Sequence, residues 1–309
     1  MKKTLYPLLA AALLTACSSD DAVGSPAADE VVDNTILLSA SVSSATRAAT
    51  TDDLQDTQFA SGEAVRVDVY RNGAATPYAG GSYTTTSAAG AMTGSLYYSA
   101  DGGAVDIEAY HPSSVAYNTT SFTVQSDQTT AAGYRQSDLM SATRLTGRYR
   151  GTVHELTFQH ALSKVVVNLS AASGSKVEAA DPTLSKLSKV VLSSTCLTAA
   201  VSKGRVTSAS GTAGTIDITA TDATTGAVLL SHVGLMVPQA LAAGTPFITV
   251  TYDGSQLAYT LPEGKTFQTG RRYTYNLQLT GDAITLQGVT IDDWDAEATA
   301  LNGQAERSK

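Results

Sequence analysis

Few side chains in this sequence have the types and spacing that catalysis or cofactor binding requires. His154, Glu155 and His160 lack the spacing of a zinc protease, and they fall in segments that alternate like strands rather than on a helix. Gly264-Lys265-Thr266 ends like a phosphate-binding loop, but the glycine required five residues earlier is Tyr259. The sequence therefore predicts no catalytic residues, no enzyme activity, no metal site and no cofactor, and we expect His160 to be a hydrogen-bonded histidine at the edge of a core.

Three further groups are weak candidates for chemistry. The acidic run at 292–295 could contact calcium, but a solvated acidic turn is the expected structure. Cys196 has no histidine partner in a recognisable pattern, so we expect a small buried residue. Trp294 could form part of a sugar platform, although an isolated aromatic residue more often packs at the end of a strand.

The start of the chain carries the one cysteine whose surroundings indicate covalent modification. A cationic start precedes the apolar run 5–14, which is too short for a membrane-spanning helix of about 20 residues, and small residues follow. This pattern is typical of a secretory signal, and Leu14-Thr15-Ala16-Cys17 resembles the lipobox of bacterial lipoproteins. The resemblance implies cleavage before Cys17 and acylation of its sulfur and new amino group, which anchors a protein to a membrane. The alternative is an ordinary signal peptide with an incidental cysteine.

A lone arginine among small residues indicates a second processing step. We expect cleavage between Arg47 and Ala48, which removes 47 of the 309 residues and leaves 262. That length suits two domains of about 130 residues each. The alternative for Arg47 is a plain loop arginine, and the same Ala-Thr-Arg tripeptide at 142–144 is interpreted as an unrelated linker.

Composition excludes one class of partner and one source of stability. The net charge is −8 and no cluster of Lys or Arg is present, so nucleic-acid binding is not expected. If Cys17 is acylated, Cys196 is the only free thiol, and no disulfide can form within the chain. The fold must therefore be stabilised by buried cores.

Alternation of apolar and polar residues predicts an all-β fold of antiparallel sandwiches. Turn signals such as Asn72-Gly73 and Asp253-Gly254 separate the segments. Strands are expected at 36–42, 64–70, 105–110, 121–125, 156–162, 164–169, 187–192, 215–220, 227–230, 247–252, 257–261, 272–279 and 284–291.

The expected organisation has four parts. Residues 1–17 form the signal and lipobox, and residues 18–47 form a propeptide with a removable first strand. Residues 48–146 and 147–309 form two β-sandwich domains, joined by a polar link near 144–151.

Six motifs in order give the chain a resemblance to a known family. Together they are similar to the fimbrillin-like subunits of major and minor fimbriae in Bacteroidales bacteria, the type V pilins. The motifs are Thr46-Arg47-Ala48, Phe59-x-x-Gly62-Glu63-x-Val65, Ala109-Tyr110-His111-Pro112, Asp138-Leu139-Met140-x-Ala142, Leu156-x-Phe158-x-His160-Ala161-Leu162-Ser163-Lys164-Val165, and Gly270-Arg271-Arg272-Tyr273 followed by Val289-x-Ile291-x-x-Trp294.

The resemblance implies a fold, a route and a set of partners. The fold is two tandem transthyretin-like antiparallel β-sandwich domains. The subunit travels as a lipoprotein to the outer membrane and the cell surface, where an arginine-specific protease cuts the Thr-Arg-Ala site. A strand from another fimbrial subunit then fills the groove that the first strand leaves, and the fimbrium contributes to adhesion to host glycan or protein.

The strand upstream of Arg47 has the pattern that this exchange needs. Ile36, Leu38, Ala40 and Val42 form one side of it, so its loss would expose an apolar trench and unpaired backbone groups. Such an edge accepts an added strand through main-chain hydrogen bonds and pockets for alternate side chains.

Two questions stay open on the sequence alone. The tail at 295–303 is rich in alanine and would fill a deep groove poorly, so either the strand 284–291 donates or this subunit accepts without donating, as a tip or accessory protein. The alternative function is a lipid-anchored surface binding protein of the same fold, specific for glycan or host protein, that does not polymerise.

Overall fold

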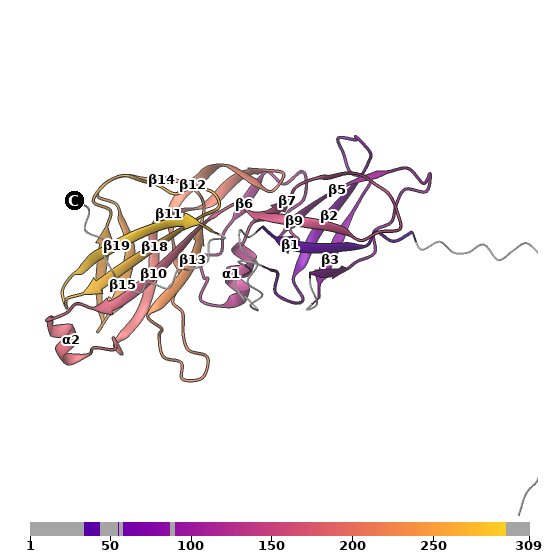
Figure 1. Ribbon diagram of the computed structural model, residues 1–309. Helices are drawn as coiled ribbons and strands as arrows, with labels where there is room; N and C mark the ends of the chain where they lie inside the picture. The colour runs from indigo at the N-terminus through magenta and orange to yellow at the C-terminus, as the bar shows by residue number, and fades with distance from the viewer. Residues whose placement is uncertain (1–33, 44–54, 56–57, 87–89, 295–309) are drawn as a thin grey trace, which may run out of the picture. The chain divides into compact units, whose positions relative to one another are not determined.

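The computed structural model (Figure 1) describes residues 34–43, 55, 58–86 and 90–294. These residues belong to one compact unit that begins at Asn34. The predicted processing residues Cys17, Arg47 and Ala48 lie outside the described residues. The described chain is mostly β, as the sequence predicts, and contains two short helices.

Eight strands form the first sheet, in the order β2-β3-β4-β1-β9-β7-β5-β8. Strands β2 and β5 are also paired over six residues, so seven of the eight strands close into a ring and β8 lies beyond β5. Closing a sheet removes the exposed edges at which other strands could add. The bounds are β1 Leu38–Val42, β2 Ala64–Arg71, β3 Ala79–Thr85, β4 Ala91–Thr93, β5 Val105–His111, β7 Met140–Ala142, β8 Leu145–Arg148 and β9 His154–His160.

The rest of the described chain forms three smaller sheets and the helices. One sheet has the order β13-β10-β18-β19, a second has the order β12-β11-β15-β16 with β6 also paired to β11, and β14 pairs with β17. The bounds are β6 Ser121–Thr123, β10 Ser163–Ala171, β11 Leu187–Ser202, β12 Arg205–Asp217, β13 Ser231–Met236, β14 Ala240–Leu241, β15 Pro246–Tyr252, β16 Ser255–Thr260, β17 Lys265–Thr266, β18 Arg271–Leu279, β19 Ile284–Asp293, α1 Ala131–Ser137 and α2 Lys176–Ala180.

Strand β2 shows how the alternating pattern becomes buried structure. Val65, Val67 and Val69 are fully buried on one face, as their spacing predicts. Asp68 and Tyr70 on the opposite face are buried too, because the loop after β5 covers them. A buried carboxylate needs hydrogen bonds, and Asp68 accepts one from the backbone N–H of this loop at 3.0 Å.

Two clusters of buried apolar side chains stabilise the described chain. The first lies among the strands of the ring, and the second lies among the remaining sheets and ends at Trp294. Leu156 and Phe158 of β9 belong to the first cluster, so the first sheet continues to His160, past the domain boundary expected at 147. The division into two domains and their transthyretin-like topology stay predictions.

Several details of the predicted strands were wrong. The segment 227–230 forms only a single bridge, at Val228, and the next strand, β13, begins at Ser231. Of the strand expected at 215–220, residues 215–217 end β12 and residues 218–220 lie beyond it. The polar link near 144–151 contains β8, which pairs with β5. Most strand pairs are antiparallel, but β1–β9 and β10–β18 are parallel. Cys196 is half-buried rather than buried.

A buried carboxylate connects strand β5 to the turn between β11 and β12. Glu108 accepts hydrogen bonds from the hydroxyls of Tyr70 and Tyr110 at 2.5 and 2.6 Å. Its other carboxylate oxygen accepts a hydrogen bond from Lys203 Nζ at 3.0 Å and lies 3.4 Å from the guanidinium of Arg144. Arg144 also pairs with the carboxylate of Asp106, so the second Ala-Thr-Arg tripeptide has a structural role.

These partners determine the ionisation of Glu108. Burial acts to raise its pKa, but the hydrogen bonds from Tyr110, Tyr70 and Lys203 outweigh burial and hold the pKa below the ordinary value of 4.5. In the unfolded chain the carboxylate therefore takes up a proton at higher pH than in the folded chain. The stabilisation is complete above about pH 4.5 and is lost as the pH falls through the lowered pKa.

We expect Glu108→Gln to lower the free energy of unfolding by about 1–3 kcal/mol at pH 7, because Lys203 and Arg144 lose their anionic partner. The difference from the unchanged chain should narrow as the pH falls below about 4.5, where the wild-type carboxylate loses its charge. Urea unfolding across this pH range measures both effects. Exposed Glu263→Gln is the matched control, and an equal pH dependence of the two variants would contradict the role of Glu108.

Candidate functional site

Strand β1 lies in the interior of the first sheet, between β9 and β4. It pairs with β9 in parallel over five residues, Leu38–Val42 against His154–Phe158. On its other side it pairs antiparallel with β4, Leu38 opposite Met92 and Ser39 opposite Ala91. Without β1, the ring of strands would be open between β4 and β9.

Backbone hydrogen bonds hold the segment on both sides beyond these pairs. The amides of Ile36 and Ala40 donate to Leu96 and Gly90 on one side, at 2.8 and 2.7 Å. On the other side, the amide of Ser43 donates to Phe158 at 2.7 Å. The segment 34–43 is therefore bonded along its whole described length.

The side chains of this segment alternate between core and surface as the sequence predicts. Ile36, Leu38, Ala40 and Val42 are at most 7% exposed and belong to the first core. Burial of an Ile, Leu or Val side chain contributes about 1.5–3 kcal/mol to the free energy of folding. Ile36, Leu38 and Val42 therefore contribute most of the stabilisation that the strand gains from burying apolar surface. Ser41 points to the other face, where its hydroxyl donates to Glu155 at 2.9 Å.

Gly90 allows β1 to approach the turn before β4. Its φ of +75° is a conformation that favours glycine, and a Cβ at this position would lie 2.0 Å from the carbonyl oxygen of Ala40. That oxygen belongs to the backbone, so it cannot move aside as a side chain could. The sequence reasoning missed this residue, although a glycine just before a short strand signals such a turn.

The end of β1 meets the last described residue of the chain. Ser43 and Trp294 line the same cavity of about 240 Å³, with His160 and Gly270. The amide of Trp294 donates to Gly270 at 2.9 Å. The residue that follows β1 and the residue that follows β19 therefore line one cavity.

The walls of this cavity include a stacked pair of rings. His160 and Trp294 are parallel within 3°, with ring centroids 3.9 Å apart. His160 Nδ1 lies 2.8 Å from Asp138 Oδ1, and Gln55 reaches the other carboxylate oxygen at 3.3 Å. The prediction that His160 is buried at a core edge is confirmed, but its Nε2 has no hydrogen-bond partner among the described residues.

The remaining candidates from the sequence have structural partners. His154 Nε2 lies 2.7 Å from the hydroxyl of Tyr98, and burial lowers the pKa of His154. Asp292 and Asp293 lie on β19, opposite Arg272 and Arg271, with which they form ion pairs, rather than in a turn. Lys265-Thr266 forms strand β17, which pairs with β14.

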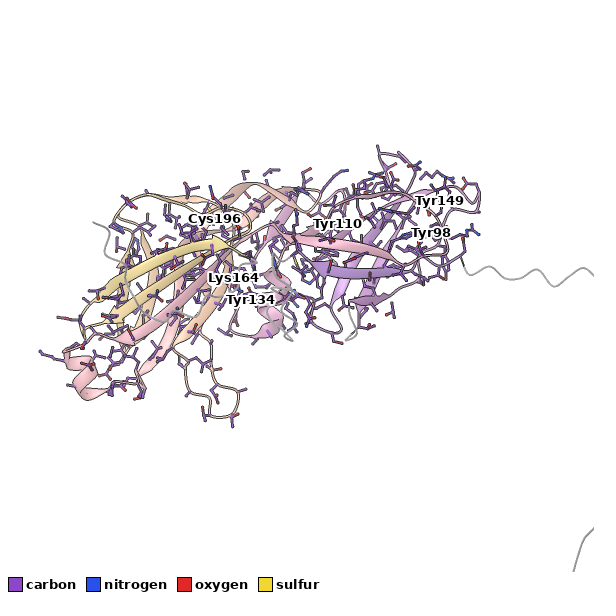
Figure 2. All side chains as sticks on the ribbon, viewed as in Figure 1. Tyr98, Tyr110, Tyr134, Tyr149, Lys164 and Cys196 are labelled. Carbon is purple, nitrogen blue, oxygen red and sulfur yellow. The ribbon has the colours of Figure 1, made fainter. Side chains whose placement is uncertain are left out.

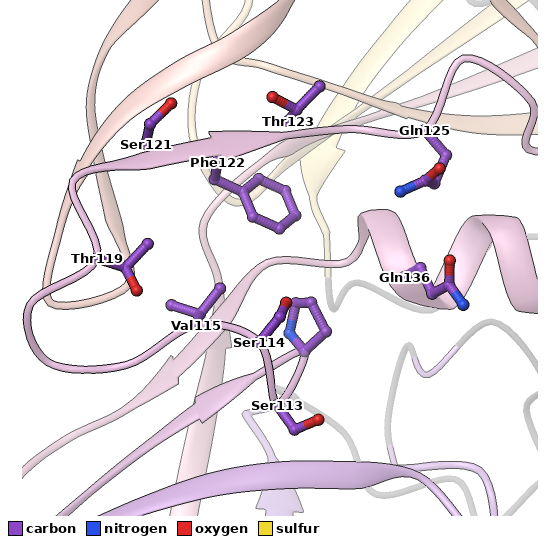
Figure 3. A pocket seen from close by; sticks show the side chains of 10 residues that line it. Ser113, Ser114, Val115, Thr119, Ser121, Phe122, Thr123, Gln125 and Gln136 are labelled. Carbon is purple, nitrogen blue, oxygen red and sulfur yellow. The ribbon is translucent and has the colours of Figure 1, made fainter.

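A larger cavity, of about 550 Å³, lies beside β6 (Figure 3). Hydroxyl and amide side chains line it, and Figure 3 shows the ring of Phe122 among them. No histidine, carboxylate, amine or thiol is among the lining residues, so no lining side chain is placed to activate the serine and threonine hydroxyls as a general base. In the described ranges, no group of three or more His, Cys, Asp or Glu side chains is placed to bind a metal ion.

Comparisons with known proteins agree with this architecture. A crystal structure from Bacteroides uniformis, described as a "putative cell adhesion protein", is 24% identical, with a TM-score of 0.62 over 85% of this chain and 100% of that one. A protein of the same description from Bacteroides ovatus is 19% identical, with a TM-score of 0.62 over 85% and 98%. The tip fimbrial protein Mfa3 of Porphyromonas gingivalis, with a C-terminal truncation, is 12% identical, with a TM-score of 0.50 over 84% and 99%. A search of the curated proteins found no match.

The sequence itself places the chain in a family. The model of the fimbrillin-like family matches residues 46–294, so this chain is a member of the fimbrillin-like family, and this membership supports a fimbrial or adhesive role at the cell surface. No helix in the part of the chain that the structure describes is long and apolar enough to cross a membrane.

We expect Gly90→Ala to lower the free energy of unfolding by more than the 1–3 kcal/mol that a strained backbone conformation alone costs. Gly73→Ala is the matched control, because Gly73 has a φ of +77° but no atom within 4 Å of the position that an alanine methyl group would occupy. Denaturant unfolding gives both values. Hydrogen exchange of the Ala40 amide, which donates to Gly90, should accelerate in Gly90→Ala. Equal losses for the two variants would contradict the close approach of β1 to Gly90.

Proposed function

We propose that this chain is a structural subunit of a cell-surface fimbrium that contributes to adhesion. In this proposal it is exported as a lipoprotein acylated at Cys17, matured by an arginine-specific protease that cuts between Arg47 and Ala48, and assembled by donor-strand exchange. Family membership supports the fimbrial role. The interior position of β1 is the observation that supports the exchange step.

Removal of β1 would create a site that binds a strand. Strands β4 and β9 would each lose their backbone partners, and the pockets of Ile36, Leu38, Ala40 and Val42 would open. Unpaired backbone groups and exposed apolar surface are both unfavourable in water. A replacement strand restores the backbone hydrogen bonds and the burial of the apolar pockets if it presents apolar side chains at four alternate positions, the third of them small.

One cut would have two effects. Cys17 and β1 both precede Arg47 in the sequence, so cleavage after Arg47 separates the lipid anchor and the strand from the rest of the chain together. Before the cut, β1 is bonded on both sides and keeps the groove occupied. We infer that the uncut chain is the exported monomer and the cut chain is the form that assembles.

The structure narrows the choice of donor strand. The segment 284–291 lies in β19, which pairs with β18 over nine residues, from Arg271–Asp293 to Leu279–Ile284. Its use as a donor would break all of these pairs. We infer that the donor strand is either the segment after Trp294 of another copy of this chain or a strand from another kind of fimbrial subunit.

We expect Arg47→Ala to abolish maturation and polymerisation in the producing cell. The surface protein should then begin at an acylated Cys17, because the preferred protease site is lost, and polymer bands on unheated SDS gels should disappear. Mass spectrometry of the N-terminus and the gels measure both effects.

Arg205→Ala is the matched control, since Arg205 is an exposed arginine outside the expected processing site. This control should mature and polymerise as the unchanged chain does. Normal polymerisation of Arg47→Ala would overturn the cleavage step. A surface protein that starts entirely at Cys17 in the unchanged chain would favour the tethered, non-polymerising binding protein.

A synthetic peptide of residues 34–43 should rebind to the cut chain and raise its thermal unfolding temperature, because a ligand that binds only the folded state stabilises it. Leu38→Asn in the peptide should abolish the rise, since Leu38 fills a buried pocket. Ser39→Asn should retain it, since Ser39 is half-exposed on the other face. Differential scanning fluorimetry gives the result, and equal effects of the two peptides would contradict a groove with alternating pockets.

A further inference from the structure

Exposed aromatic side chains gather at one end of the first sheet. Of the eight large hydrophobic side chains that are exposed in the described chain, five lie there, with exposed fractions of 39–63%. We call four of them the tyrosine patch: Tyr78, Tyr97, Tyr149 and Val153. The fifth, Leu37, precedes Arg47 and would leave with β1 on cleavage, so it is not part of the patch. Monomeric soluble proteins usually scatter such side chains singly, so a group marks an interaction surface.

Hydrogen bonds hold the members of the tyrosine patch together. The hydroxyl of Tyr78 donates to the carbonyl oxygen of Tyr97 at 2.8 Å. Buried Tyr98 lies beneath the patch and donates to the carbonyl oxygen of Tyr149 at 3.0 Å, and Figure 2 shows these two residues side by side. Tyr98 also contacts the ring of His154, the neighbour of Val153. The backbone that carries the patch is therefore fixed before any partner binds, which lowers the entropy cost of binding.

The tyrosine patch surrounds one end of β1. Thr35 forms a bridge with Tyr97, and the carbonyl oxygen of Leu37 accepts the amide of His154 at 2.9 Å. The other end of β1, at Ser43, adjoins Trp294 of the same chain. A subunit that delivers a strand into the groove of β1 must place its own body at one of these two ends, and only the patch end exposes a group of apolar side chains among the described residues.

The charged side chains around the patch indicate the charge of the partner. Arg71, Arg148 and Arg150 are exposed beside the tyrosines, and Arg71 lies 5.8 Å from the ring centroid of Tyr78. Among the described residues, Asp101 forms an ion pair with Arg71, and Glu155 lies on β9 close to Val153. These three arginines and two acidic residues together carry one net positive charge, although the chain as a whole has a net charge of −8. Tyrosine and arginine are also the residues enriched at the energetic centres of protein interfaces.

We propose that the tyrosine patch is the docking surface for the body of the neighbouring fimbrial subunit that supplies the replacement strand. The partner is a protein of net acidic charge, for which a second copy of this chain is the nearest example. This inference rests on the proposed fimbrial assembly. Docking at the patch brings the donor strand to the open end of the groove and adds contacts that the strand alone does not make.

Site-specific photo-crosslinking in cells that make the full chain tests the docking. Tyr149→p-benzoylphenylalanine places a photoreactive aromatic group at the most exposed position of the patch. Irradiation should join it to another fimbrial subunit, identified by mass spectrometry. Leu229→p-benzoylphenylalanine, at an exposed leucine outside the patch, is the control and should give several-fold less adduct.

The outcomes separate the docking from the assembly mechanism. Polymer without a subunit adduct at position 149, an adduct with saccharide only, or equal adduct yields at positions 149 and 229 would overturn the docking. A subunit adduct in cells that form no polymer would support docking and overturn strand-exchange assembly. Neither polymer nor adduct in the position-149 variant and the position-229 control alike would overturn both.

A double variant provides an independent measurement. Tyr97→Ala with Tyr149→Ala removes two exposed rings whose loss should leave the fold intact, because each is more than half exposed. Polymer yield should fall about tenfold or more, as for the loss of two interface hot spots. Leu229→Ala with Leu230→Ala is the matched control. A polymer yield equal to that of this control, with normal cleavage after Arg47, would overturn the docking.

Discussion

The seating of β1 between β4 and β9 is the constraint on which the rest of the first sheet depends. The pairing of β2 with β5 closes the ring on one side, so the ring is complete only while β1 fills the remaining gap. Four buried side chains and a backbone bonded on both sides make that gap costly to leave empty. The same interactions that stabilise the strand therefore give a replacement strand its affinity.

Buried polar groups connect this ring to the remaining sheets. Glu108 on β5 binds Lys203 at the turn between β11 and β12, and Asp138 binds His160, which stacks on Trp294. Such groups need every hydrogen bond to offset the cost of burial, so they fix one arrangement of the chain more strictly than apolar contacts do. These contacts fix the position of the end of β19 and of the cavity beside Ser43 relative to the site of β1.

The fold and the candidate site were predictable to different degrees. The alternation of Val65, Val67 and Val69 predicted β2, and the pattern from Ile36 to Val42 predicted both a strand and its buried side, because period-two burial is local in sequence. The short strands β4 and β7 were not predicted, since three residues give too little pattern. The arginines that pair with Asp292 and Asp293 were also missed as partners, because pairing across β18 and β19 is set by register.

The sequence by itself determined the all-β class and the family, and it predicts the export signal and the cut at Arg47, because each depends on residue types in a short segment or on motifs in order. Only the tertiary structure decided that β1 is an interior strand, parallel to β9, and that Gly90 approaches its backbone. It also decided that Tyr78, Tyr97 and Tyr149 meet at one end of the sheet. These features join residues that lie tens to more than a hundred positions apart, and register and packing, rather than local propensity, bring them together.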